Sequence, residues 1–171
     1  FAMICLLLSP PTATAADKEI TIALTADAVH VDPQQGNELT SNIMFNHFYD
    51  TLVRRTAELD FVPGLAESWE LKDDLTWVFK LRKGVKFHNG DELKASDVLF
   101  SIERCKNQLM SNLVRYIAEA NALDDYTVEI KTPKPYAVLH MDLSEFHILN
   151  EKYVKNIGDE QLNLKPMGTG P

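Results

Sequence analysis

The amino-acid sequence predicts a mixed α/β fold, and two patterns in it support this prediction. In several short runs apolar residues alternate with polar ones, as in strands with one buried face, and elsewhere apolar residues recur at helical spacing. The 171 residues suffice for a domain with a core, and 45% hydrophobic and 25% charged residues are typical of a folded globular chain. Strands and helices follow one another in unequal runs, so the pattern alone leaves α/β and α+β both open.

The first 16 residues are predicted to be the end of a secretory signal peptide. A seven-residue apolar run is broken by Pro10 and Pro11, and Ala13 and Ala15 then form an A-x-A cleavage pattern. A buried N-terminal helix is the alternative interpretation, and two prolines directly after so short a run disfavour it.

Charge and cysteine content exclude several classes of protein. The net charge is −8 with the acids spread along the chain, which disfavours a nucleic-acid partner. No stretch is long enough to span a membrane. Cys5 lies in the predicted signal peptide, so the mature chain keeps only Cys105, which can form no internal disulfide and is expected to be a buried helix residue.

The first elements after this segment are a strand, a loop and a helix. Residues 19–25 alternate and are predicted to form a strand, and residues 26–38 have loop chemistry. A helix is expected from about Leu39 to Arg54, begun by a cap at Thr40 or Ser41. Its predicted inward stripe contains Ile43, Met44, His47, Phe48, Thr51 and Leu52.

Two strands and a turn are predicted next. Strands at residues 68–71 and 76–82 flank the acidic turn Asp73-Asp74, because Asp bonds its own backbone two residues on. The inward residues of the second strand are Trp77, Phe79 and Leu81. The indole N–H of Trp77 is expected to find an acceptor. A second turn follows at residues 88–91, where Asn-Gly can adopt positive φ.

The C-terminal part is predicted to contain a helix, a strand and a further helical segment. The helix after Ser96 should turn Val98, Leu99, Ile102 and Cys105 inward. A second acidic turn, Asp124-Asp125, leads into an alternating strand at residues 126–131. Helical spacing returns between about Leu143 and Val154.

The histidines and carboxylates allow an enzyme or metal site as an alternative. His47 and Asp50 lie three apart on the predicted helix, and His30 and Asp32 are close in the loop, but neither pair has a further ligand or a positioned nucleophile. No nucleophile elbow or phosphate-binding glycine motif is present. We therefore expect no catalytic residue, metal or cofactor. His88, His140 and His147 are expected to be structural or exposed.

Seven motifs occur in an order that resembles the extracytoplasmic solute-binding proteins of the peptide/nickel class, which serve ABC importers. The resemblance covers essentially all of residues 18–171. The motifs are D-P at Val31–Pro33, Y-D-T-L-V at Tyr49–Val53, P-x-L-A-x-S-W at Pro63–Trp69, T-W-x-F-x-L-R-x-x-V-K-F-H-x-G at Thr76–Gly90, A-x-D-V-x-x-S-I-E-R at Ala95–Arg104, D-D-Y-T-V-E-I at Asp124–Ile130 and P-x-G-T-G-P at Pro166–Pro171.

The resemblance implies the N-terminal portion of a periplasmic-binding-protein-like, two-lobe fold, about the first third of a family member. Residues 17–45 would begin the first lobe, residues 46–165 would form an accessory α/β domain, and residues 166–171 would return to the first lobe. One departure from the family is Lys94, which stands where Thr or Ser is usual. The helix cap is therefore expected to pass to Ser96.

Family members take part of their ligand contacts from the loop and helix start after the D-P turn. Carried onto this sequence, the ligand-binding candidates are Gly36, Asn37, Glu38 and Asn42. Backbone groups there would pair with a peptide main chain, and Glu38 would receive an amino terminus. A plain surface loop is the alternative.

The resemblance implies a periplasmic, monomeric protein that captures oligopeptides or dipeptides and delivers them to a membrane permease.

 Alternatives within the family are a nickel chelate, glutathione or an oligosaccharide as the solute, and a secreted hydrolase using the His-Asp pairs is a third hypothesis.

Overall fold

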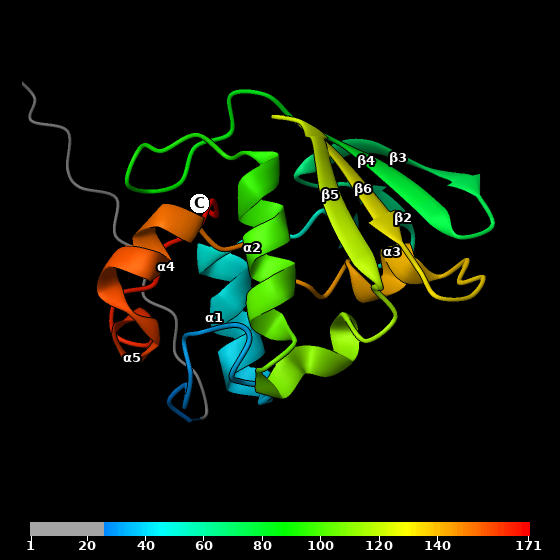
Figure 1. Ribbon diagram of the computed structural model, residues 1–171. Coiled ribbons are helices and arrows are strands. Elements are labelled where there is room, and N and C mark those ends of the chain that lie inside the picture. The colour runs from blue at the N-terminus through cyan, green and yellow to red at the C-terminus, as the bar shows by residue number, and fades with distance from the viewer. Residues whose placement is uncertain (1–25) are drawn as a thin grey trace, which may run out of the picture.

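The computed structural model describes residues 26–171 (Figure 1). The predicted signal peptide and the predicted strand at residues 19–25 lie outside the described residues. The helices are α1 (Leu39–Phe48), α2 (Ala95–Cys105), the 3₁₀ helix η1 (Leu109–Leu113), α3 (Leu139–Asp142), α4 (Glu151–Ile157) and α5 (Asp159–Leu162). The strands are β1 (Val53–Arg55), β2 (Phe61–Pro63), β3 (Ala66–Asp73), β4 (Thr76–Leu81), β5 (Glu119–Asp124) and β6 (Thr127–Lys131).

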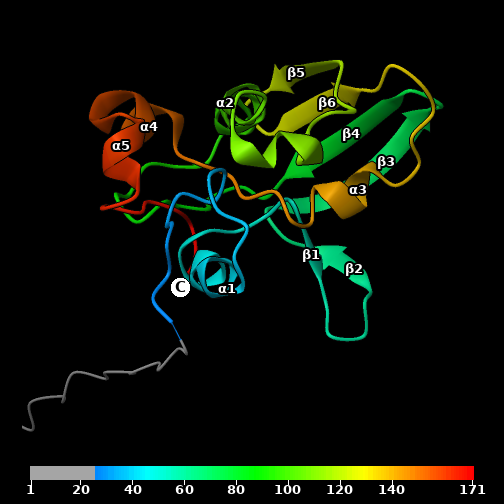
Figure 2. The same ribbon diagram turned by 90° about the horizontal axis from the view of Figure 1, so that it is seen from below.

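The strands form an antiparallel sheet of order β3-β4-β6-β5 and a separate β1-β2 hairpin. Figure 2 shows the hairpin projecting away from the larger sheet. The two acidic turns close the hairpins of the sheet as predicted. Oδ1 of Asp73 accepts a hydrogen bond from the N–H of Leu75, and Oδ1 of Asp124 accepts one from Tyr126. The mixed helix and sheet content confirms the predicted fold class.

The main core lies between the sheet and α2, which runs alongside β5 and β6 (Figure 1). The buried residues of these elements include Trp77, Phe79, Leu81, Val98, Ile102, Cys105, Val128 and Ile130. The predicted inward faces of β4, β6 and α2 are thus confirmed, with Leu99 packing at the edge of the cluster. The indole N–H of Trp77 donates to the carbonyl oxygen of Tyr136 at 3.1 Å, as expected.

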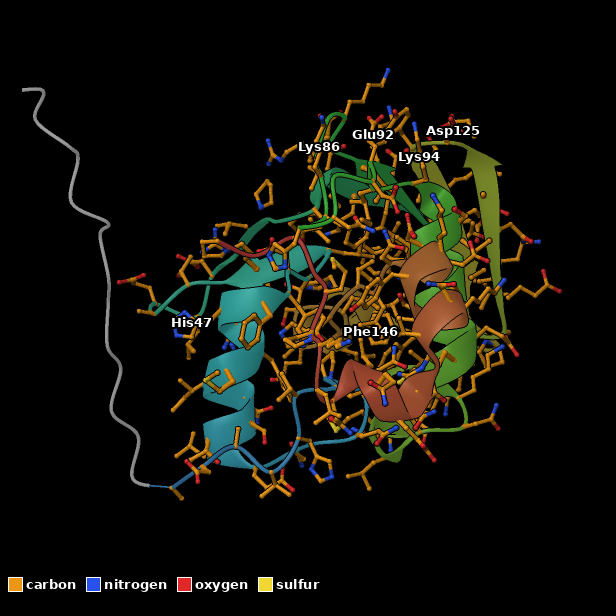
Figure 3. The ribbon with its side chains drawn as sticks, turned by 90° about the vertical axis from the view of Figure 1, so that its left-hand side faces the viewer. His47, Lys86, Glu92, Lys94, Asp125 and Phe146 are labelled. Carbon is orange, nitrogen blue, oxygen red and sulfur yellow. The ribbon has the colours of Figure 1, made fainter. Side chains whose placement is uncertain are left out.

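The helix predicted at residues 39–54 is shorter than expected. It ends at Phe48 because Tyr49 is extended, with φ −127° and ψ 151°, and Thr51 then pairs with His147. The predicted stripe is wrong on α1 itself, where the buried residues are Ser41 and Phe45. Figure 3 shows His47 on the outer side of the helix. The residues after Phe48 take part in strand pairing, so their apolar side chains pack as those of a strand do.

Both predicted helix caps are wrong. Glu38 precedes α1 without a side-chain capping bond, since Thr40 bonds the carbonyl of Asp27 and the hydroxyl of Ser41 accepts from His30. Lys94, rather than Ser96, precedes α2.

The start of α2 is stabilised by Asp97 instead of a capping hydroxyl. Oδ2 of Asp97 accepts from the N–H of Lys94, and Oδ1 accepts from the N–H of Glu151 at the start of α4, each at 2.9 Å. Burial raises the pKa of Asp97, while these two backbone hydrogen bonds favour its ionised form. The carboxylate therefore joins two helices that lie far apart in the sequence.

The helical segment predicted at residues 143–154 is also wrong in its first half. Residues 146–150 are non-helical because Ile148 donates its N–H to the carbonyl of Asp50 and Leu149 donates to Oγ of Ser101. The segment therefore crosses the core in an extended form, and Phe146 lies in the interior (Figure 3). Strand β5 was not predicted, because most of its residues are exposed and no alternating pattern marks it.

Candidate functional site

The loop that carries the candidate binding residues is fixed at its base by a buried ion pair. Nη2 of Arg104, near the end of α2, is 2.5 Å from Oδ2 of Asp32 in the D-P turn. Arg104 also donates to Gln34 at 2.7 Å and to Asp159 at 2.9 Å. The Arg104 side chain is 7% exposed and that of Asp32 is fully buried. Although burial works against the charged form, the hydrogen bonds and charge of Asp32 and Asp159 raise the pKa of Arg104.

Neutral side chains hold the rest of the loop. Oδ1 of Asn163 accepts hydrogen bonds from the N–H groups of Val31 and Asp32, at 3.0 and 2.9 Å. Nε2 of Gln34 donates to the carbonyl of Ser101, and the carbonyl of Gln34 accepts from Met110. The loop is thereby attached to α2, to η1 and to the chain after α5.

A hollow of about 500 Å³ lies beside this loop and runs along α1. Its lining residues are Pro33, Asn37, Asn42, Phe45, Asn46, Tyr49, Asp50, Thr51, Arg54, Arg55, Met110, Ser144, Glu145 and His147. The volume falls in the range of small-molecule sites, about 300–1,000 Å³. Polar side chains dominate the lining, so the hollow suits a polar solute.

The structure brings two of the four candidate residues together in the hollow. Asn37 and Asn42 line it, whereas Gly36 and Glu38 are not among its lining residues. Gly36 is buried, and a Cβ atom there would meet Cβ of His30 at 2.9 Å and the Phe45 ring at 3.1 Å. Glu38 is exposed, with Oε1 3.5 Å from Nδ1 of His30. A hydrogen bond from its own backbone N–H lowers the pKa of Glu38, which is therefore a carboxylate at neutral pH.

The lining of the hollow also includes charged groups and one buried imidazole. Arg55 and Glu145 lie 3.5 Å apart, and Asp50 accepts a hydrogen bond from Thr169 at 2.9 Å. The ring of His147 lies edge-on to Phe45 and Tyr49, with centroids 5.8 and 6.2 Å away. Burial lowers the pKa of His147 to about 4, so the ring is neutral at physiological pH. Within residues 26–171, Nε2 of His147 has no hydrogen-bond partner.

The C-terminal G-T-G-P motif packs against the end of α1 and against His88. Nε2 of His88 lies 2.9 Å from the carbonyl oxygen of Gly170, and its Nδ1 lies 3.4 Å from the N–H of Gly168. The N–H of Gly170 donates to the carbonyl of Phe48, one of the last carbonyls of α1. A Cβ at Gly168 would lie 1.9 Å from that same carbonyl oxygen, so only glycine fits there. His88 is thus structural, as predicted.

The pairs that suggested a hydrolase are not arranged for catalysis. Asp32 is engaged by Arg104 and His30 lies near Glu38, while His47 is exposed and Asp50 bonds Thr169. No group of three or more His, Cys, Asp or Glu residues in the described part of the chain could hold a metal ion. Cys105 is buried, and burial raises the pKa of its thiol to about 12. Among residues 26–171, no helix combines the length and apolar character needed to cross a membrane.

Sequence reasoning missed the residues that support the site. Arg104 ends the S-I-E-R motif and Asp32 belongs to the D-P motif, so both were noticed, but nothing in their spacing indicates that they meet. Asn163 belongs to no interpreted pattern, Arg54 was expected only at the end of a helix, and His147 was expected to be structural or exposed. Their roles depend on contacts with residues distant in the sequence.

Comparisons with known proteins agree with this geometry. Residues 60–171 match the family model described as bacterial extracellular solute-binding proteins, family 5 Middle. The glutathione-binding protein GsiB of Escherichia coli O1:K1 / APEC is 32% identical over 167 residues, which cover 91% of this chain and 32% of GsiB. The chain thus spans about a third of the length of the curated relatives it matches.

Solved structures share the fold. DppA of Helicobacter pylori, in complex with the peptide STSA, is 31% identical with a TM-score of 0.74, over 85% of this chain and 34% of DppA. NikZ of Campylobacter jejuni, in complex with Ni(L-His), is 28% identical with a TM-score of 0.75, over 85% of this chain and 30% of NikZ. These neighbours are two-lobe periplasmic binding proteins. The chain belongs to the bacterial extracellular solute-binding proteins of family 5.

Proposed function

We propose that the whole protein is the periplasmic solute-binding component of an ABC importer, which captures oligopeptides or dipeptides and delivers them to the membrane permease. Family membership is the observation that carries this proposal. The firmly held loop beside a polar hollow supports it, because a binding site needs groups that keep their positions before the solute arrives.

Gly36, Asn37, Glu38 and Asn42 are the residues we propose for solute contact. Asn37 and Asn42 offer amide donors and acceptors at the hollow. The N–H groups of Gly36 and Asn37 bond to no other group within residues 26–171, which leaves them free for the main chain of a peptide. The carboxylate of Glu38 would receive an amino terminus.

The domain division remains a proposal as well. We assign residues 17–45 to the start of the first lobe, 46–165 to an accessory domain and 166–171 to the return to the first lobe. The hydrogen bond between Asp50 and Thr169 brings the two proposed connections between the first lobe and the accessory domain together, and this supports the division. Because α1 continues to Phe48, the chain would pass from the first lobe to the accessory domain a few residues after the proposed boundary at residue 45.

Export, a monomeric state and the absence of catalysis belong to the same proposal. Residues 1–16 would be the end of the signal peptide that directs the chain to the periplasm. Solute capture requires no chemistry, so neither a cofactor nor a catalytic residue is assigned.

Two related solutes have specific support. GsiB is named a glutathione-binding protein, and NikZ was solved with a nickel–histidine complex. Glutathione and a nickel chelate are therefore alternatives to a peptide, ahead of an oligosaccharide.

Calorimetry and thermal unfolding of the whole protein test the proposal. A dipeptide and tetrapeptide mixture, glutathione, nickel–histidine and maltotriose would each be added at millimolar concentration. A bound solute stabilises the native state by about 2.7 kcal/mol at one hundred times its Kd. Asn42→Ala should weaken binding, whereas Asn121→Ala on exposed β5 should not. The absence of binding by every class of solute would contradict the proposal.

The hydrolase hypothesis has its own test. Purified whole protein would be assayed for peptide and ester hydrolysis beside His30→Ala and His47→Ala. Turnover that either substitution abolishes would establish that hypothesis and overturn ours.

A further inference from the structure

Leu59, at the tip of the β1-β2 hairpin, has a backbone conformation that leucine rarely adopts. Its φ is 71°, and it is the one residue other than glycine with a positive φ among residues 26–171. In this left-handed region the Cβ atom of leucine lies too close to a carbonyl oxygen, whereas glycine adopts the region readily. The hairpin thus carries backbone strain that glycine at position 59 would avoid.

Hydrogen bonds keep the tip in an ordered turn in spite of this strain. The N–H of Thr56 donates to the carbonyl of Asp60 at 2.9 Å, and the N–H of Leu59 donates to the carbonyl of Thr56 at 3.0 Å. Oγ1 of Thr56 accepts from the N–H groups of Glu58 and Asp60, at 3.2 and 3.3 Å. An ordered turn loses little conformational entropy when a partner binds to it.

No packing within residues 26–171 offsets the strain at Leu59. Its side chain is 67% exposed, and the turn between β1 and β2 stands clear of the rest of the molecule (Figure 2). Other exposed leucines, such as Leu71 on β3 and Leu123 on β5, have negative φ. A single exposed leucine needs no explanation, but a strained one indicates a role for the side chain outside the folded core.

Two carboxylates flank this leucine. Glu58 and Asp60 are both exposed, and neither forms an ion pair within the described part of the chain, while Arg55 in the same hairpin pairs with Glu145. An apolar side chain between two carboxylates is complementary to an apolar pocket bordered by lysine or arginine.

We propose that the tip of the hairpin, residues 56–60, is a docking element for the membrane permease, with Leu59 entering an apolar pocket that basic groups border. The inference rests on the proposed function and names a surface through which the loaded protein contacts its partner. Strand β1 also contributes Arg54 and Arg55 to the lining of the hollow. The docking element and the hollow therefore share a strand.

Stimulation of ATP hydrolysis tests the inference, with the whole solute-loaded protein and its importer reconstituted in lipid nanodiscs. Leu59→Asn removes the apolar side chain but keeps a residue type that tolerates positive φ. The protein concentration for half-maximal stimulation should rise about ten- to a hundredfold, which corresponds to the burial of one leucine side chain. Leu123→Asn, a matched change at an exposed position on β5, should leave this concentration unchanged.

Two further measurements separate docking from folding and from solute binding. Leu59→Asn should not lower the unfolding temperature, because it removes no packing, and calorimetry should give it the solute affinity of the parent protein. The double variant Glu58→Gln, Asp60→Asn should also raise the concentration for half-maximal stimulation. Its stimulation should depend less on salt, because the docking element would have lost its charges.

Three outcomes would overturn the inference. Stimulation that Leu59→Asn leaves unchanged would remove the docking element while the proposed function stands. A lower unfolding temperature or a weaker solute affinity of Leu59→Asn would mean that the rest of the chain covers Leu59. A dimer of the parent protein that sedimentation detects and Leu59→Asn abolishes would assign the tip to a second copy. A parent protein that neither binds solute nor stimulates the importer would contradict the proposed function and this inference with it.

Discussion

Asp32 and Arg104 lie 72 residues apart in the sequence and form a buried, two-pronged ion pair. Each carboxylate oxygen of Asp32 faces a different guanidinium nitrogen, at 3.3 and 2.5 Å. The pair joins the loop that precedes α1 to the end of α2. It therefore fixes the candidate solute loop relative to the main core.

Breaking this pair should destabilise the protein strongly. Arg104→Gln leaves the fully buried Asp32 carboxylate without its charged partner, and such a loss costs about 3–5 kcal/mol. Urea unfolding of the whole protein measures the change. Glu103→Gln breaks the exposed pair with Lys106 and should cost less than about 1 kcal/mol. Equal costs for the two variants would show that burial does not govern the strength of this pair.

Asn163→Ala should loosen the solute loop without unfolding the core. Its side chain accepts two backbone hydrogen bonds, from Val31 and Asp32, and each net contribution is about 1 kcal/mol. Hydrogen–deuterium exchange should accelerate at residues 31–38 and remain unchanged in β4 and β6. Glu160→Ala, also near α5 but exposed, is the control. Unchanged exchange at residues 31–38 would mean that the contacts of Arg104 and Gln34 suffice to hold the loop.

Gly168→Ala should disrupt the packing of the C-terminal motif on α1. The added Cβ would lie 1.9 Å from the carbonyl oxygen of Phe48, so the backbone must move and the bond from Gly170 to that carbonyl is lost. We expect a loss of more than about 2 kcal/mol in the free energy of unfolding. Gly84→Ala is the control for backbone strain. Gly84 has φ +74°, but an added Cβ there would meet no other atom, so this variant has the strain without the steric clash. Its cost should be nearer 1 kcal/mol. A larger loss for Gly84→Ala would contradict the steric explanation.

The burial of His147 predicts a pH dependence of stability. Its pKa is about 4 in the folded protein, below the ordinary value of 6.5. As the pH falls below 6.5, the unfolded chain gains a proton that the native protein excludes, and the free energy of unfolding decreases until about pH 4. Its full extent is about 3 kcal/mol. Stability is therefore unaffected by this group above pH 6.5.

Chemical unfolding between pH 7.5 and 4.5 measures the effect. His147→Phe should flatten the decrease, while His47→Ala, at an exposed position, should leave it unchanged. Burial also lowers the pKa of His140, so part of the slope should persist in His147→Phe. An identical slope in His147→Phe and the parent protein would exclude His147 as its source.

Local chemistry allowed much of the fold to be predicted. The inward residues of β4, the alternation in β6, the two Asp-Asp turns and the inward face of α2 each depend on neighbouring residues, and the structure confirms them. Burial in β4 does not alternate, because Thr76 and Val78 are buried as well. The motifs also indicated the correct family, because they preserve both residue types and spacing.

Errors occurred where distant contacts override local preference. Residues 49–55 have apolar positions that suit a helix, yet pairing of Thr51 with His147 and of β1 with β2 extends them. Ser96 is a better capping residue than Lys94, but Asp97 bonds the backbone of Lys94 and moves the helix start. The polar supports of the solute loop were unpredictable for the same reason, since Arg104 and Asn163 act on residues 72 and more than 130 positions away.

The contact between Thr169 and Asp50 spans 119 residues, so the intervening segment begins and finishes at one spot on the molecule. A polypeptide loop with adjoining ends can be spliced into a host, resized or exchanged without displacing the residues on either side. The segment from β1 to α5 could accordingly be remodelled as one unit, provided that the contact of Arg104 with Asp32 is kept.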